Sequence, residues 1–121
     1  MPKTYTDEQL LRLCVDSANE KLAEDVVTLE IGHASSIADY FVIASGTSST
    51  HVKSLADDVE YELEQIGVHD GHIEGRATGW VLLDYGAVRV HVFDKQSREY
   101  YNLERLWTDA QVLDISEIVK D

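Results

Sequence analysis

The sequence predicts a single α/β domain with a mixed sheet of about five strands flanked by helices. Helical and strand patterns follow one another along the 121 residues in the order helix, strand, strand, helix, three strands and helix. Residues 40–44 are apolar throughout, which is typical of a strand covered on both faces. The length fits one hydrophobic core, so residues 1–121 are expected to form one domain.

The first element is expected to be an amphipathic helix over residues 7–24. Thr6 and Gln9 have the spacing of a capping box, and the two acidic residues between them suit the positive end of a helix dipole. Apolar side chains then recur every three or four positions, at Leu10, Leu11, Cys14, Val15, Ala18 and Leu22. The place of Cys14 on this stripe favours a buried thiol over a reactive one.

Two strands and a second helix are expected next. Residues 26–31 are rich in β-branched side chains, and residues 40–44 supply the second strand. Between Val52 and Ile66, apolar side chains keep helical spacing over four turns, and Gly67 is expected to end this helix. The outer side of the helix is acidic, which favours a solvated surface over one that steers a partner. Its acidic residues are Asp57, Asp58, Glu60, Glu62 and Glu64.

The C-terminal half is expected to hold a short strand, a β-hairpin and a short helix. The short strand covers residues 72–74, and residues 80–84 and 88–93 alternate in hydropathy on either side of a glycine-containing turn. A helix is expected over residues 97–101. Alternation divides the last strand into a face of three valines and a second face with Arg89, His91 and Phe93.

Strong negative charge favours some partners and disfavours others. Asp and Glu number 23 and Lys and Arg number 10, which gives a formal net charge of −13. Nucleic-acid backbones and anionic membranes are disfavoured because both are bound through cationic side chains. A basic protein surface is favoured. The single cysteine, a polar N-terminus and the lack of a long apolar run lead us to expect a cytosolic protein.

Motifs for catalysis or metal binding are weak in this sequence. Residues 46–49 form a strand-to-helix turn that could cradle a phosphate, but the lysine of a P-loop is missing, so helix capping is favoured. Asp58 and Glu60 resemble a metal-binding pair, yet residues two apart on a helix point about 200° apart. Residues 69–74 lack the further ligands of a closed zinc site.

Aromatic side chains concentrate in the C-terminal half of the chain. Tryptophan and tyrosine provide large contact area at low entropic cost, so they are frequent anchors of protein interfaces. Aromatic anchors with a few charges and no reaction centre indicate a binding module rather than an enzyme. The aromatic residues of this region are Trp80, Tyr85, Phe93, Tyr100, Tyr101 and Trp107.

Five blocks of sequence resemble one known family. In order, they are residues 36–48 (SIADYFVIASGTS), 73–75 (IEG), 79–86 (GWVLLDYG), 90–93 (VHVF) and 101–107 (YNLERLW). They are similar to blocks of the ribosomal silencing factor family, also called Iojap. The resemblance extends from the first helix to about residue 107 and leaves residues 108–121 as a C-terminal tail.

The resemblance implies a fold and a function. The implied fold is an α/β/α sandwich with a five-stranded mixed sheet, distantly related to nucleotidyltransferases but without their catalytic carboxylates. Members bind the large ribosomal subunit through ribosomal protein L-fourteen and sterically block its association with the small subunit. They thereby repress translation under nutrient limitation, and they are often homodimers. The resemblance implies no catalysis, cofactor, metal or membrane. It also implies that the protein makes little or no direct contact with nucleic acid.

The resemblance also assigns eight residues to the partner interface. For each of them the alternative is a role in folding, and Trp80 suits a cap over the core equally well. Two further matching residues, Asp39 and Tyr40, are assigned to folding. The eight interface residues are Trp80, Asp84, Tyr85, His91, Tyr101, Leu103, Glu104 and Leu106.

Two other functions stay open at this point. An assembly factor of the large subunit would use the same interface, so the sequence does not separate it from a silencing factor. A nucleotide-binding enzyme would use the turn at residues 46–50, and magnesium with a nucleotide would then stabilise the protein against heat.

Overall fold

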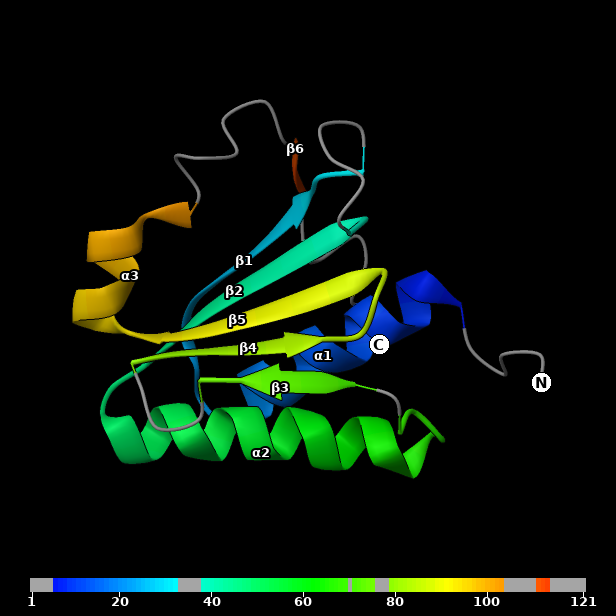
Figure 1. Cartoon of the computed structure of the whole chain (residues 1–121), viewed down its shortest axis with the longest axis horizontal. Helices are drawn as coiled ribbons and strands as arrows, with labels where there is room; N and C mark the ends of the chain where they lie inside the picture. Colours follow the sequence, from blue (N-terminus) through cyan, green and yellow to red (C-terminus); the bar gives the residue numbers. More distant parts are fainter. Residues whose placement is uncertain (1–5, 33–37, 70, 76–78, 104–110, 114–121) are drawn as a thin grey trace.

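A mixed sheet of six strands forms the centre of the computed structural model, which describes residues 6–32, 38–69, 71–75, 79–103 and 111–113. The strand order is β3-β4-β5-β2-β1-β6 (Figure 1). The predicted α/β class with a mixed sheet and flanking helices is confirmed. The elements are α1 (Asp7–Glu20), β1 (Glu24–Glu30), β2 (Tyr40–Gly46), α2 (Ser49–Gln65), β3 (His72–Glu74), β4 (Trp80–Asp84), β5 (Val88–Asp94), α3 (Lys95–Tyr101) and β6 (Gln111–Leu113).

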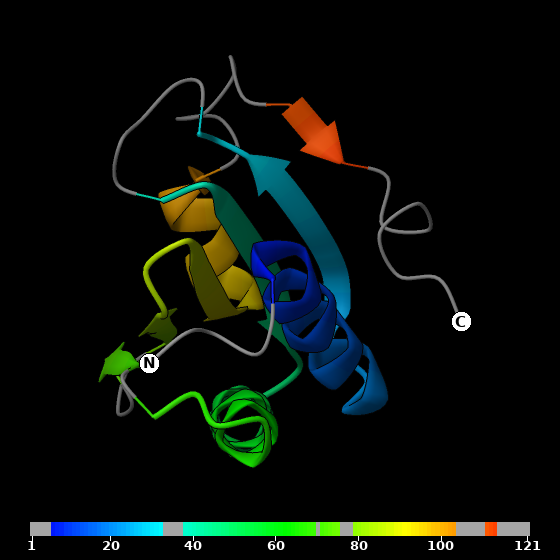
Figure 2. The same ribbon diagram turned by 90° about the vertical axis from the view of Figure 1, so that its right-hand side faces the viewer.

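The five predicted strands correspond to β1 to β5, and β6 adds a strand at one edge. β2 and β5 form a parallel pair at the centre, and the other neighbouring strands are antiparallel. β6 pairs with β1 from within the C-terminal tail, and Figure 2 shows it beside β1. With only three residues, β6 is too short to show a hydropathy pattern of its own.

The two faces of the sheet are covered to different extents. α1 and α2 pack on one face and close a core that includes Val42, Val59, Leu63, Val81 and Val90. α3 lies against the other face, away from α1 and α2 (Figures 1 and 2). On β4, residues that face α2 are buried, whereas alternate residues on the other side are partly exposed. We call the side that carries α3 the open face.

Side-chain caps fix where the helices begin. The expected capping box of α1 is present: Thr6 Oγ1 accepts a hydrogen bond from the Gln9 backbone N–H, and the Gln9 side chain accepts one from Thr6 N–H. Ser48 caps α2 through the backbone N–H of His51. These bonds satisfy backbone donors that have no partner within a helix.

α1 ends at Glu20, before its predicted end. Leu22 was expected on the buried apolar stripe of this helix, but it lies outside the core. Leu22 has a left-handed backbone (φ 62°), and 78% of its surface is exposed. The N–H groups of Leu22 and Ala23 close the helix by donating to the carbonyls of Asn19 and Ala18. Apolar spacing continues through Leu22, but the chain has already left the helix. α2 ends in the same way at Gly67 (φ 92°), as predicted.

A Leu22→Gly variant is expected to be more stable than the wild type by about 0.5–1 kcal/mol. Glycine adopts the left-handed conformation without a steric cost, and an exposed leucine side chain loses little packing. The matched control is Gly67→Ala, because a Cβ there would meet no atom within 4 Å and only the backbone strain would count. That variant should lose stability. Urea denaturation measures both, and a destabilised Leu22→Gly protein would contradict the argument.

Thr28 places a hydroxyl group in the apolar interior. It pairs with Val42 across β1 and β2 and so faces the core beneath α1 and α2. The side chain is fully buried, and within the described residues its Oγ1 has no hydrogen-bond partner. A buried hydroxyl without a partner loses its hydration and gains nothing in return.

A Thr28→Val variant should therefore unfold with a free energy about 1 kcal/mol higher than that of the wild type. Valine keeps the shape of threonine and removes only the polar group. Thr28→Ser is the control, because it keeps the hydroxyl and removes a methyl group, and it should lose stability. Equal or lower stability of Thr28→Val by urea denaturation would show that the hydroxyl has a partner in solution.

α3 is fixed to the open face by its first two turns. Asp94 caps the helix by accepting a hydrogen bond from the Ser97 N–H at 2.7 Å. Arg98 donates to Ser45 Oγ of β2 at 2.9 Å, and Lys95 forms an ion pair with Glu24 of β1. Asn102, with φ 45°, ends the helix, and the next residue, Leu103, is buried. These contacts position Tyr101 of α3 beside Trp80 of β4.

Candidate partner-binding surface

The open face brings residues of β4 and β5 into adjacent rows. In the antiparallel register, Trp80 lies opposite Phe93, Leu82 opposite His91, and Asp84 opposite Arg89. All of them point away from α2, because their neighbours Val81, Leu83 and Val90 belong to the core under α1 and α2. The rows run from an aromatic end, near α3, to a charged end at the turn between the two strands.

Trp80 occupies the centre of the aromatic end. Its ring stacks on Phe93 with a centroid distance of 5.1 Å and contacts Tyr101 at 4.7 Å. Phe93 is buried, whereas Tyr101 is 45% exposed and its neighbour Tyr100 is 81% exposed. Trp80 therefore connects the core to a partly exposed aromatic surface, an arrangement that suits a partner of apolar or cationic character.

His91 lies beneath this surface. It is only 4% exposed, and its ring packs against Phe41 at a centroid distance of 4.5 Å. Its Nδ1 accepts a hydrogen bond of 3.1 Å from Trp80 Nε1–H. Burial, and secondarily the positive charge of Arg89, lower the pKa of His91 to about 4, so the ring is neutral at pH 7. A partner therefore has almost no direct access to His91.

The charged end of the open face is held by Asp84. Its Oδ2 is 3.2 Å from an Arg89 guanidinium nitrogen, and both side chains are partly exposed. Its Oδ1 accepts a hydrogen bond from the N–H of Gly86, which has φ 81° in the turn between β4 and β5. Asp84 therefore stabilises the hairpin turn in addition to carrying charge on the open face.

The eight residues assigned to the interface do not all lie together. Trp80, Asp84 and Tyr101 share the open face, with His91 beneath them and Leu103 in the core on the same side. Tyr85 packs instead against the core under α1 and α2, with its ring over Gly71. The remaining two, Glu104 and Leu106, lie outside the described residues.

Two further residues of the open face had no assigned role. Leu82 is partly exposed between Trp80 and Asp84, and Arg89 pairs with Asp84. β3 extends the surface with His72 and Glu74, and His72 Nε2 is hydrogen-bonded to Glu74 Oε1 at 3.0 Å. Alternation along β4 and β5 puts Leu82 and Arg89 on the same side as Trp80 and Phe93, so a sequence signal for them existed.

The turn after β2 is used for helix capping. Thr47 N–H donates to Nδ1 of His51 at 2.9 Å, and Nε2 of the same ring contacts the Lys21 carbonyl at 2.7 Å. A Cβ at Gly46 would lie 2.8 Å from Val52, so glycine is required for the close approach of α2. The N–H of Thr47, which a phosphate would need, is already bound, and this favours capping over a phosphate site.

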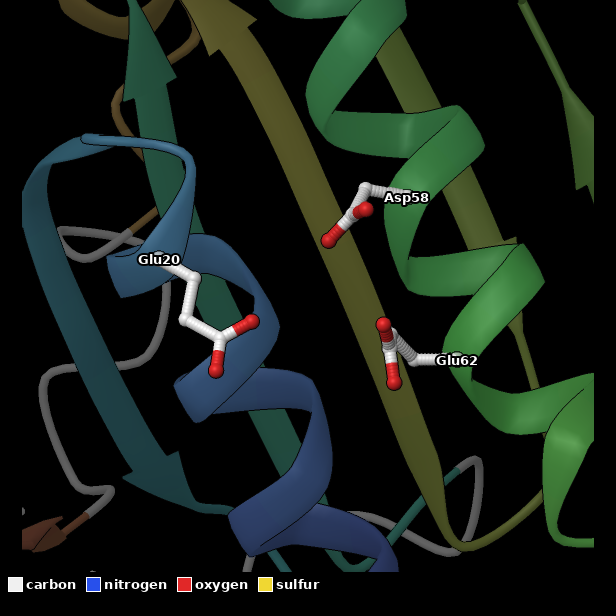
Figure 3. Close-up of side chains that lie close together, drawn as sticks. All are labelled: Glu20, Asp58 and Glu62. Carbon is white, nitrogen blue, oxygen red and sulfur yellow. The ribbon is translucent and has the colours of Figure 1, made fainter.

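One group of carboxylates lies between α1 and α2. Oxygens of Glu20, Asp58 and Glu62 all lie within 4.8 Å of one another (Figure 3). Asp58 accepts a hydrogen bond from Ser17 Oγ at 2.7 Å, and its other oxygen is 3.8 Å from Lys21 Nζ. These contacts join the two helices. Asp58 and Glu60 both lie on α2, as expected, which argues against their acting as a metal-binding pair.

Asp39 and Tyr40 have backbone roles at the start of β2, as assigned. Both N–H groups donate to the Ala87 carbonyl, and the Asp39 carbonyl accepts from Ile31. Their side chains border an acidic cavity of about 570 Å³ near the start of α1, together with Glu8 and Glu30. Partial burial, followed by the negative charge of Glu30, raises the pKa of Tyr40. This cavity is separate from the open face.

A family model described as ribosomal silencing factor during starvation matches residues 4–121. The chain belongs to this family. A ribosomal silencing factor of Halalkalibacterium halodurans is 38% identical over 115 residues, which are 94% of this chain and 98% of that protein. A crystal structure of a protein from Chromobacterium violaceum matches with a TM-score of 0.83 and 31% identity, and covers 86% of this chain and 88% of that one.

A more distant relative has a name that refers to assembly. It is the mouse protein named mitochondrial assembly of ribosomal large subunit protein 1, which is 29% identical over 100 residues. These cover 79% of this chain and 44% of that protein. In the described part of the chain, no helix is both long and apolar enough to cross a membrane.

Proposed function

We propose that this protein binds the large ribosomal subunit and keeps it from joining the small subunit, which represses translation under nutrient limitation. Membership in the ribosomal silencing factor family supports the proposal, because relatives with that name match nearly the whole chain. Such a role needs no reaction centre. The bound protein must cover the surface that the small subunit contacts, and it must dissociate slowly relative to the rate at which the subunits meet.

The open face is the proposed contact surface, and the aromatic pair of partly buried Trp80 and exposed Tyr101 carries this part of the proposal. The other face of the sheet is covered by α1 and α2, so the open face alone offers sheet residues to a partner among the described residues. Aromatic rings anchored on a buried core provide contact area without large losses of side-chain entropy.

The proposed partner on the subunit is a basic ribosomal protein, L-fourteen. The net charge of −13 opposes contact with ribosomal RNA and speeds encounter with a basic surface. Many of the described cations are also neutralised locally, because Arg12, Lys21, Arg89 and Lys95 each lie near a carboxylate. The protein would act in the cytoplasm as one domain, as a monomer or a homodimer.

Sedimentation of purified ribosomal subunits tests this function. The subunits are mixed with and without the protein, at a magnesium concentration that permits joining, and separated on a sucrose gradient. The protein should travel with the large subunit, and the peak of joined ribosomes should shrink. A protein that stays at the top of the gradient would contradict the proposal.

An assembly role is the second candidate, and the name of the mouse relative favours it. An assembly factor would bind the large subunit at the same surface without changing the joining of mature subunits. Deletion of its gene would lead to the accumulation of immature large subunits. A nucleotide-dependent enzyme is less well supported, because the turn after β2 is occupied by its own capping bonds.

A further inference from the structure

A polar contact from below holds the orientation of Trp80. Trp80 Nε1–H donates to His91 Nδ1 at 3.1 Å, and the two ring centroids are 5.8 Å apart. His91 is fixed in turn by Phe41, whose ring centroid is 4.5 Å away. The hydrogen bond to buried His91 is directional and fixes the orientation of the indole. The contacts of the indole with Phe93 and Tyr101 are ring contacts, which allow one ring to slide over the other.

We propose that His91 is a positioning residue for partner binding, and that the bond from Trp80 to its Nδ1 holds the indole in the orientation that a partner meets. This inference rests on the proposed function of the open face. It gives His91 an indirect role, because a side chain that is 96% buried has almost no surface with which to contact a partner.

The other nitrogen of His91 supports this assignment. Because Nδ1 accepts the Trp80 hydrogen bond, the proton of the neutral ring lies on Nε2. Nε2 is buried and has no hydrogen-bond partner among the described residues. In the sheet register His91 lies between Leu82 and Ile43, both apolar. A residue that only filled space here would serve the fold better as a leucine, because an unpaired buried donor is destabilising.

The wild type and two variants of His91 distinguish a role in positioning Trp80 from a role in folding. His91→Leu removes the acceptor and the unpaired donor, and it should be at least as stable as the wild type in urea denaturation. Its affinity for purified large subunits should nevertheless fall about tenfold, the effect of one lost hydrogen bond. His91→Asn places an amide oxygen near the position of Nδ1, so it should bind within about threefold of the wild type.

A double-mutant cycle tests whether the effect passes through the indole N–H. Trp80→Phe keeps an aromatic ring and removes the donor, so adding His91→Leu to this variant should cause no further loss of affinity. An equal loss in both backgrounds would overturn the inference. So would wild-type binding by His91→Leu, or a loss of binding that follows a loss of stability in both His91 variants.

A measurement without ribosomes keeps this inference separate from the proposed function. The chain has two tryptophans, and a Trp107→Phe variant assigns the two indole N–H signals in an NMR spectrum. Hydrogen exchange of the Trp80 signal should be at least about tenfold faster in His91→Leu than in the wild type. Equal rates would overturn the positioning role. If the exchange rates differ as expected but the wild-type protein does not bind large subunits, only the proposed function is contradicted.

Discussion

Trp80→Ala is expected to weaken binding to the large ribosomal subunit by at least about 2 kcal/mol, or roughly thirtyfold. The indole lies between buried Phe93 and half-exposed Tyr101, so its removal takes away both a contact and the support for its neighbour. Tyr101→Ala should act in the same direction. Quantitative co-sedimentation with purified large subunits measures both effects.

The matched control for these variants is Tyr61→Ala. Tyr61 is 55% exposed on α2, which covers the opposite face of the sheet, so its loss should leave binding unchanged. Circular dichroism should show an intact fold in all three variants. Wild-type affinity of both Trp80→Ala and Tyr101→Ala would mean that the open face is not the contact surface, even if the protein binds the subunit elsewhere.

Acid should destabilise the wild type relative to His91→Leu. The pKa of His91 is about 4 in the folded protein, below the ordinary histidine value of 6.5 that applies to the unfolded chain, so the unfolded chain binds more protons between these two pH values. Stability from the neutral buried ring is therefore fully present above pH 6.5 and is lost as the pH falls toward 4. The loss should be about 3 kcal/mol, since each pKa unit corresponds to about 1.4 kcal/mol.

Urea denaturation of both proteins at pH 7 and pH 4 measures this difference. All other titratable groups are shared, so their contributions largely cancel when the wild type is compared with His91→Leu. The gap between the two free energies of unfolding should move in favour of the variant at pH 4. Parallel pH profiles would show that the folded protein binds a proton at His91 as readily as the unfolded chain does.

Much of the fold could be predicted from periodicity, because each element has one buried side. The apolar spacing of α2 and the alternation along β4 and β5 determined both the type of element and its inward face. The end of α1 could not be predicted in this way. Leu22 continues the apolar spacing after Ala18, but backbone hydrogen bonds from the following residues close the helix first.

The candidate site was predictable in part. Alternation placed His91 and Phe93 on one face, but only strand pairing shows that Trp80 lies opposite Phe93 and reaches His91. The burial of His91 depends on Phe41, which arrives from a strand far away in sequence. Tyr85 matches a family block, but it packs on the covered side with Val81 and Leu83, where continued alternation along β4 would place it.

The parallel pairing of β2 with β5 has a consequence for how the protein folds. The antiparallel pairs β1–β2 and β4–β5 join strands adjacent in the chain, whereas β2 and β5 meet only after α2, β3 and β4 have been made. Contacts between distant segments form late, because loop closure costs entropy before they are gained. The buried side chains beneath Trp80 come from both β2 (Phe41) and β5 (His91 and Phe93). A newly made chain therefore gains its binding surface only after β2 and β5 have paired.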